Sequence, residues 1–183
     1  MSENEPYVQL QMVWPEELFA TPPAVHLPAG YSLRTYQPGD EQRFYVLMAL
    51  AGWPDWDDAR LRPWLPRIPD ECWFMVIHEA SGEIVASAMG LHDDTDLHPG
   101  GGELGWVAGD PAHAGRGLGL AVCAAVTSRL IELGYRNIHL YTEHWRFAAL
   151  KTYLKLGYRP FLFTPEMPAR WQVVELTLCT STC

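Results

Sequence analysis

Three alternating glycines stand just before an amphipathic segment, in the stretch Ala114-Gly115-Arg116-Gly117-Leu118-Gly119. Glycines at this spacing let the backbone turn sharply and bring several amide N–H groups toward one point. The first turn of the helix expected to follow has unpaired N–H groups and the positive end of the helix dipole. An anion suits such a turn, so the sequence predicts that a phosphate-bearing molecule binds here.

Two common phosphate-binding patterns do not fit this turn. A dinucleotide-binding turn needs a small residue at the position of Leu120 and an acidic residue about twenty positions further on. A nucleotide-triphosphate loop needs Gly-Lys-Ser or Gly-Lys-Thr after the glycines, and the sequence has neither. The phosphates are therefore expected to belong to another kind of ligand.

The glycine turn resembles the acyl-CoA pyrophosphate loop of the GCN5-related N-acetyltransferase (GNAT) family. That family carries Gln/Arg-x-x-Gly-x-Gly/Ala after a strand and a Val-x-x-x-Pro step. In this sequence Val107 to Pro111 forms the step, and Gly117-Leu118-Gly119 closes the signature. Ala114 stands where the family has Gln or Arg, and Arg116 inside the loop could supply the missing positive charge.

A second motif follows in the order that the resemblance requires. The segment 144–158 is similar to the later GNAT pattern Asn-x-x-Ala-x-x-x-Tyr-x-x-x-Gly-Phe/Tyr, and Ala149, Tyr153, Gly157 and Tyr158 are in register with it. Arg146 stands at the Asn position, with a phosphate or Glu143 as its expected partner. The two motifs together cover roughly the C-terminal third to half of the chain, and their order is more specific than either motif alone.

Acyl transfer from a thioester to an amine needs a base for the amine, stabilisation of the carbonyl oxygen and an acid for the departing thiolate. The resemblance implies a carboxylate at the start of the strand before the loop, which makes Glu103 the candidate base. An exposed glutamate at a strand start is the alternative, and Glu143 is the second candidate. Tyr153 is the candidate acid, because a phenol with a pKa of about 10 can protonate a thiolate; a tyrosine of the core is the alternative.

The resemblance implies acetyl-CoA as co-substrate. No metal is expected, because residues 92–98 lack the Gly and distal Glu of a calcium loop and their two histidines, six positions apart, do not have a common zinc spacing. The residues expected to bind acetyl-CoA are Trp106, Val107, Ala108, Ala114, Gly115, Arg116, Gly117, Leu118, Gly119, Arg146 and Ala149. The Val107 N–H is expected to face the thioester carbonyl, with Gly105 marking a bulge or a close approach there.

Composition restricts the partners. The chain has 183 residues, a net charge of −9 and a pI of about 5.1, which predict one domain and exclude general nucleic-acid binding. No segment has the length of a bilayer span or the pattern of a signal peptide, so no membrane partner is expected. The four cysteines have no metal or redox spacing, which predicts free thiols and a cytoplasmic location.

Hydrophobic patterns predict the elements that hold these residues. Residues 1–30, rich in proline, are expected to form an extended N-terminal arm over a domain at 31–183, and residues 92–102 a solvated acidic loop. Helices are expected at Glu41–Ala51, Asp57–Trp64, Leu118–Leu133 and Phe147–Leu156. Strands are expected at Tyr31–Tyr36, Cys72–Glu79, Glu83–Leu91, Glu103–Ala108, Asn137–Thr142, Tyr158–Phe163 and Trp171–Leu178.

The stretch 103–142 is a strand–helix–strand crossover, so its two strands should be parallel, whereas the hairpins on either side should be antiparallel. The expected fold class is thus a single α/β (α+β) domain, GNAT-like, with a mixed, mostly antiparallel twisted sheet and helices on both faces. The resemblance implies that the central parallel pair splays apart and holds the CoA arm in the gap.

The expected function is transfer of an acetyl or acyl group from acetyl-CoA to an amine by direct attack. The acceptor is left open between a small-molecule amine and a peptide amine. The tryptophans between Trp53 and Trp73 either pack in the core or form the wall of an acceptor pocket, with an aspartate from 55–58 at its mouth. A non-catalytic acyl-CoA-binding domain and an O-acyltransferase are the alternatives. The oligomeric state is left open, with a homodimer among the possibilities.

Overall fold

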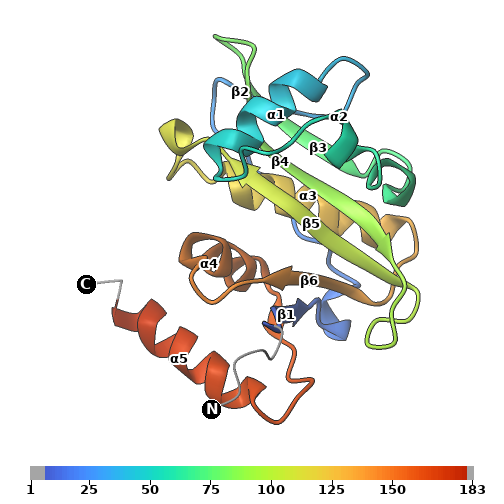
Figure 1. Ribbon diagram of the computed structural model, residues 1–183, viewed down its shortest axis with the longest axis vertical. Helices are drawn as coiled ribbons and strands as arrows, with labels where there is room; N and C mark the ends of the chain where they lie inside the picture. Colours follow the sequence, from blue (N-terminus) through green and yellow to red (C-terminus); the bar gives the residue numbers. More distant parts are fainter. Residues whose placement is uncertain (1–6, 181–183) are drawn as a thin grey trace.

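The computed structural model describes residues 7–180; the first six residues of the predicted arm and Cys183 lie outside the described part. A seven-stranded sheet runs through the domain in the order β2-β3-β4-β5-β6-β1-β7 (Figure 1). The strands are β1 (Leu10–Val13), β2 (Tyr31–Thr35), β3 (Trp73–His78), β4 (Ile84–Asp93), β5 (Gly101–Gly109), β6 (Ile138–Thr142) and β7 (Arg159–Pro160).

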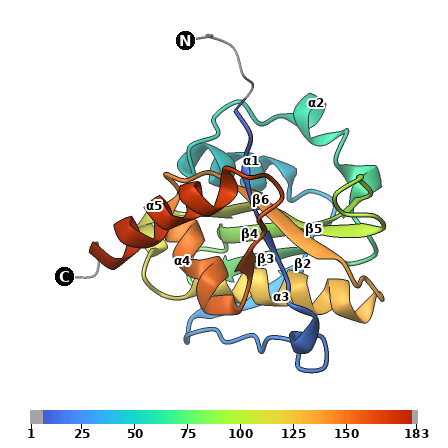
Figure 2. The same cartoon turned by 90° about the horizontal axis from the view of Figure 1, so that it is seen from below.

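Helices cover both faces of this sheet, with α1 and α2 on one face and α3 and α4 on the other (Figure 2). The α-helices are α1 (Glu41–Leu50), α2 (Asp58–Leu61), α3 (Leu118–Glu132), α4 (Phe147–Leu156) and α5 (Met167–Thr180). Short 3₁₀ helices are η1 (Glu16–Leu18), η2 (Leu65–Arg67) and η3 (Pro111–His113). The predicted fold class, one mixed sheet between two layers of helices, is confirmed.

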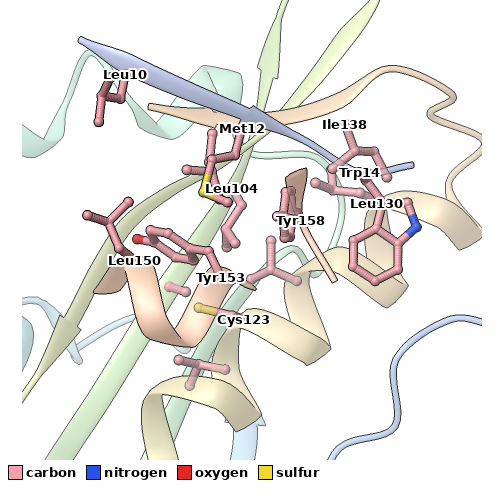
Figure 3. Close-up of a cluster of buried hydrophobic side chains, with 14 of the residues drawn as sticks. Leu10, Met12, Trp14, Leu104, Cys123, Leu130, Ile138, Leu150, Tyr153 and Tyr158 are labelled. Carbon is pink, nitrogen blue, oxygen red and sulfur yellow. The ribbon is translucent and has the colours of Figure 1, made fainter. Parts of the chain in front are cut away.

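The apolar stripe of α3 supplies much of the core on its face, because Val122, Val126 and Leu130 are fully buried at helical spacing. Tyr153 and Leu150 of α4 join the same core (Figure 3). The face under α1 has its own cluster, which includes Phe44. Each helix layer thus fixes one face of the central strands.

The strands β5 and β6 form the predicted parallel pair. They pair at Gly102↔Ile138 and Glu103↔His139, whereas the other neighbouring strands are antiparallel. Beyond this short pairing β6 turns away from β5 (Figure 1). The sheet is therefore open along β5 after Glu103.

A β-bulge lies on β5 next to this opening. Met89 pairs with Gly105 and Ser87 with Ala108, so Trp106 and Val107 together face one residue of β4. Trp106 has a φ of +48°, which is unusual for a residue other than glycine. The sequence predicted a bulge or a close approach at Gly105, and the bulge lies one residue further along, at Trp106 and Val107.

Gly105 itself is the close approach. A Cβ atom there would lie 2.9 Å from Leu91 Cδ1 and 3.0 Å from Glu103 Oε1. A side chain at position 105 would therefore displace the Leu91 side chain and crowd the carboxylate of Glu103, and glycine leaves room for both on this face of β5.

The segment predicted as an arm contributes a strand instead. Strand β1 pairs antiparallel with β6 from Leu10↔Thr142 to Val13↔His139, and Met12 pairs with Pro160 of β7. Leu10 and Met12 are fully buried. The prediction of an arm that lies over the domain was wrong for these residues, because a four-residue strand between prolines gives little periodic signal.

The last predicted strand, Trp171–Leu178, is part of helix α5. Its buried residues Met167, Trp171, Val174 and Leu178 follow the helical period rather than alternation. The Arg170 side chain donates to the Val8 carbonyl at 2.8 Å, which ties α5 to the chain just before β1. Within residues 7–180, no helix combines the length and the apolar character needed to cross a membrane.

The predicted acidic loop is also shorter than expected. Strand β4 continues through Asp93 and β5 begins at Gly101. Asp93 has a side chain only 14 % exposed, and His98 is buried. The prediction of a solvated loop was therefore wrong for these two residues, which belong to a polar cluster against the sheet.

Candidate functional site

Two cavities meet where the sheet opens between β5 and β6, and both are lined by Val107 and Tyr153. The first, the loop cavity, has a volume of about 450 Å³ and lies between the end of β5, the glycine turn and α4. The second, the charged cavity, has a volume of about 400 Å³ and lies over the start of β5 and the end of β6. Val107 and Tyr153 therefore mark the junction at which two ligands could meet.

The glycine turn has the backbone that its sequence predicted. Gly115 and Gly117 have φ values of +75° and +78°, in the left-handed region that favours glycine. Gly117 is the N-cap of α3, so the first-turn N–H groups of that helix lie at the loop cavity. No atom lies within 4 Å of a Cβ built at Gly115, Gly117 or Gly119, which leaves space for a ligand to approach the backbone.

Two lysines add positive charge to the loop cavity. Lys151 and Lys155 are the only lysines of the chain, and both line this cavity from adjacent turns of α4. Their convergence on one cavity matches a polyanionic ligand such as the phosphates of CoA. Neither lysine was predicted as a site residue, although their i, i+4 spacing on a predicted helix was a usable signal.

Most of the residues predicted to bind acetyl-CoA lie together. Val107, Ala108, Ala114, Gly115, Gly117, Leu118, Gly119 and Ala149 all line the loop cavity. Arg116 does not line it, because its guanidinium turns back and donates to the Ala112 carbonyl at 3.0 Å. Trp106 and Arg146 line the charged cavity instead.

Glu103 lies in the charged cavity and is shielded from solvent, with a side chain 14 % exposed. Burial, reinforced by the negative charge of Asp93 and opposed by Arg67, raises the pKa of Glu103 to about 7. Its nearest charged partner is Arg67 Nη2, at 3.4 Å from Oε2. A carboxyl group with this pKa can accept a proton from an amine near neutral pH.

Asp93 has a different environment from Glu103. Burial disfavours its ionised form, but hydrogen bonds from His139 and Tyr141 and the charge of Arg67 outweigh burial and lower the pKa of Asp93. Asp93 is therefore ionised near neutral pH, whereas Glu103 is only partly ionised. Asp93 was not predicted as a site residue because it stands in a polar stretch of the sequence, and Arg67 was not predicted because no motif contains it.

Tyr153 lies at the junction of the two cavities and is almost entirely buried. Burial is the main reason that the pKa of Tyr153 is raised well above its usual value. The phenol therefore keeps its proton at neutral pH, as a proton donor must. Figure 3 shows its ring beside Leu150 and Cys123.

Arg146, at the Asn position of the second motif, pairs with Glu143. The Arg146 Nε lies 2.6 Å from Glu143 Oε2, and the guanidinium lies over the Trp53 ring at 4.1 Å from its centroid. The sequence left a phosphate and Glu143 open as partners, and the structure has the Glu143 pair. This pair also engages Glu143, the second candidate base.

Aromatic rings form part of the wall of the charged cavity. Trp53 and Trp64 line it, and both rings pack edge-on against Trp106. Trp56 and Trp73, in contrast, belong to the core. The aspartates expected at its mouth do not line this cavity; instead the Asp57 side chain accepts from Arg60 N in α2, and Asp58 accepts from Tyr45.

The sheet opened at a parallel pair, with a glycine turn ahead of the crossover helix, has the GNAT architecture. The chain belongs to the acetyltransferase (GNAT) family, which it matches over residues 35–158. The match includes the β5 strand, the glycine turn and the whole second motif.

Curated relatives include mycothiol acetyltransferases. The protein from Amycolatopsis mediterranei is 33 % identical over 160 residues, which are 79 % of this chain and 49 % of the relative. The protein from Actinosynnema mirum is 30 % identical over 155 residues, which are 78 % of this chain and 49 % of the relative. The chain thus spans about half the length of these curated relatives.

Solved structures show the same fold. A GCN5-related N-acetyltransferase from Sphaerobacter thermophilus superposes with a TM-score of 0.64 at 24 % identity, over 84 % of this chain and 48 % of that chain. The ribosomal-protein-S18-alanine N-acetyltransferase from Escherichia coli gives a TM-score of 0.56 at 19 % identity, over 70 % of this chain and 77 % of that chain. At these identities the likeness concerns the fold.

Proposed function

We propose that this chain is an acetyl-CoA-dependent N-acetyltransferase in which an amine attacks the thioester directly. The observation that carries the proposal is the meeting of the two cavities at Val107 and Tyr153. One cavity suits a polyanion, and the other holds a carboxylate whose pKa of about 7 suits a general base. Acetyl-CoA would occupy the loop cavity and the amine the charged cavity.

The fit of acetyl-CoA rests on groups of the loop cavity. The backbone of Gly117 and the first turn of α3 offer N–H groups to a pyrophosphate, and Lys151 and Lys155 add positive charge. The bulge at Trp106 and Val107 leaves backbone without a regular strand partner beside the junction, where an N–H could stabilise the carbonyl oxygen.

The reaction would proceed with two proton transfers. The amine nitrogen forms a bond to the acetyl carbon as the carbon–sulfur bond breaks, and Glu103 accepts the proton that the amine loses. The Tyr153 hydroxyl donates a proton to the departing thiolate. Glu103 then releases its proton to solvent and Tyr153 recovers one from solvent, which restores the starting state. Products are the acetamide and free CoA, so atoms and charge balance.

The acceptor is an amine small enough for a cavity of about 400 Å³, or the end of a longer amine-bearing chain. Because the curated relatives are named mycothiol acetyltransferases, amines related to mycothiol are the first acceptors to test. The proposal includes the cytoplasm as the compartment, supported by the free thiols of Cys72, Cys123 and Cys179.

The test is incubation of the purified chain with acetyl-CoA and a panel of amines, followed by release of free thiol and by mass spectrometry of the product. Acetylation at nitrogen, lost on Glu103→Gln, supports the proposal. Acetylation at oxygen would make the chain an O-acyltransferase. Tight CoA binding without turnover on any amine would favour a non-catalytic binding domain and contradict the proposal.

A further inference from the structure

The carboxylate of Asp93 lies at the centre of a charged cluster beside Glu103. Its Oδ1 accepts from Arg67 Nη2 at 2.6 Å, and its Oδ2 accepts from His139 Nε2 and from the Tyr141 hydroxyl at 3.0 Å each. Both oxygens of Asp93 therefore have close donors, and the carboxylate is held in one orientation.

The strand register brings these groups together. Glu103 pairs with Leu91 of β4 on one side and with His139 of β6 on the other. Because side chains alternate along a strand, Asp93 and Tyr141, each two residues further along, lie on the same face as Glu103. Three adjacent strands thus bring the side chains of Asp93, Glu103 and Tyr141 together, and Arg67 reaches them from η2.

Arg67 is held mainly by Asp93 and only weakly by Glu103. The same Nη2 atom lies 2.6 Å from Asp93 and 3.4 Å from Glu103. The Arg67 Nε donates to the His92 carbonyl at 3.1 Å, and the guanidinium lies over the Trp64 ring at 4.9 Å from its centroid. Charge-assisted N–H···O bonds are typically about 2.7–2.9 Å long, so the contact to Glu103 is a weak one.

His139 holds the other side of Asp93 as a neutral donor. It is fully buried, its ring stacks on His98 with centroids 3.7 Å apart, and burial is the main reason that its pKa falls to about 4. Its Nε2–H donates to Asp93, while the buried Nδ1 has no partner among the described residues. The neutral ring can therefore fix Asp93 without neutralising its charge.

We propose that Asp93 is a positioning residue for Glu103: by holding Arg67, it prevents the guanidinium from pairing with Glu103 and leaves that carboxylate free to accept the proton of the acceptor amine. This inference rests on the proposed function for the use of that proton. The other ionisable groups around Glu103 are His139 and Tyr141 of β6, Glu143 and Arg146 after it, and Tyr153 of α4.

The test is a titration of the Glu103 carboxyl by ¹³C NMR on chain labelled in glutamate, without acetyl-CoA or acceptor. The Glu103 signal is identified by its loss in Glu103→Gln. Asp93→Asn removes a neighbouring negative charge and releases Arg67 toward Glu103, so the pKa of Glu103 should fall by about 1 unit or more. Asp96→Asn, the same charge change at an exposed position of the loop between β4 and β5, should leave the pKa of Glu103 unchanged.

A double-mutant cycle separates positioning from a general loss of structure. Arg67→Gln should raise the pKa of Glu103 much more in the Asp93→Asn background than in the native chain, because Asp93 then no longer holds the guanidinium. An unchanged pKa in Asp93→Asn, or an equal effect of Arg67→Gln in both backgrounds, would overturn the proposal. If circular dichroism shows that Asp93→Asn does not fold, the pKa of Glu103 in the single variant Arg67→Gln tests the proposal instead. A rise below about 1 unit supports the proposal, and a larger rise shows that Arg67 already pairs with Glu103.

The NMR titration and the activity assay test the positioning role and the proposed function independently of each other. The NMR measurement needs no turnover, so it tests the hold of Asp93 on Arg67 even if no amine is acetylated. If acetylation is detected, the acid limb of kcat/KM in Asp93→Asn should move to lower pH by the same amount as the titration. A titration that shifts while the limb stays in place would overturn Glu103 as the base and with it the positioning role.

Discussion

Gly117 offers the most direct test of the loop cavity, because its backbone is left-handed while the space around it is open. Its φ and ψ are 78° and 9°, and no atom lies within 4 Å of a Cβ built there. An alanine at this position therefore meets no steric obstacle, and its cost is the left-handed backbone alone. That cost is about 1–2 kcal/mol for a residue with a Cβ.

Gly119 is the matched control. It lines the same cavity and also has no atom within 4 Å of its Cβ position, but it lies inside α3 without a positive φ. Alanine in a helix is favoured over glycine by about 0.5–1 kcal/mol. The same substitution should therefore have opposite effects on the free energy of unfolding at two positions that are two residues apart.

Thermal unfolding and calorimetry with CoA measure both consequences. In a chain of this size 1 kcal/mol changes Tm by about 2–4 °C, so Gly117→Ala should lower Tm by about 2–8 °C, whereas Gly119→Ala should leave Tm unchanged or raise it. If the loop relaxes to escape this strain, binding must restore it, and CoA affinity should fall by roughly 5- to 30-fold in Gly117→Ala. Equal Tm values for the two variants would refute the role of the left-handed backbone. A lowered Tm with unchanged CoA affinity would contradict the expected coupling between this left-handed backbone and CoA binding.

Four further substitutions test the remaining parts of the site. Glu103 can accept a proton only when ionised, so kcat/KM should rise as pH increases through about 7, and Glu103→Gln should remove that rise and lower the rate most at alkaline pH; a retained limb would exclude Glu103. Tyr153→Phe keeps the ring and deletes the hydroxyl, so kcat should fall by about 10²-fold or more with CoA affinity unchanged, and full activity would exclude Tyr153 as the acid. Lys151→Gln and Lys155→Gln should each weaken CoA binding by about two- to fivefold at low salt and less at high salt, and affinities that do not depend on salt would contradict a role in binding phosphates.

The parts of the fold that the sequence predicted are those with strong local patterns. Helix α4 begins and ends where the motif and the terminal Gly157 indicated, and α3 follows its glycine turn. The parallel relation of β5 and β6 followed from the crossover between them. For the two helices a residue pattern within about fifteen positions carried the information, and for the parallel pair the strand–helix–strand order of 103–142 carried it.

The parts that the sequence did not predict depend on contacts between distant segments. Strand β1 has four residues, and its place in the sheet depends on β6, more than a hundred positions later. In α5, exposed Val173 and Leu176 add apolar residues between the buried ones, so the segment resembles an alternating strand. Only packing against the rest of the domain distinguishes the two interpretations.

The candidate site likewise contains residues that the motifs predicted and residues that only the folded structure brings together. Glu103 and Tyr153 were predicted from the motifs and lie in one cavity. Asp93 comes from the end of β4, and the sheet register places it beside Glu103. Arg67 comes from η2, and the packing of η2 against β4 brings it to both carboxylates. The environment that sets the protonation of Glu103 is therefore a property of the folded sheet, which no local pattern contains.

The overall negative charge of the chain does not oppose the binding of a polyanion, because charge acts locally. At physiological ionic strength the Debye length is about 8 Å, so exposed charges further away are largely screened. The carboxylates of the charged cavity are mostly compensated, since Asp93 pairs with Arg67 and Glu143 with Arg146. The lysines of the chain, in contrast, both line the loop cavity. Phosphates at that cavity would therefore meet a local excess of positive charge on a molecule whose net charge is −9, and the amine would meet a carboxylate that is only partly ionised.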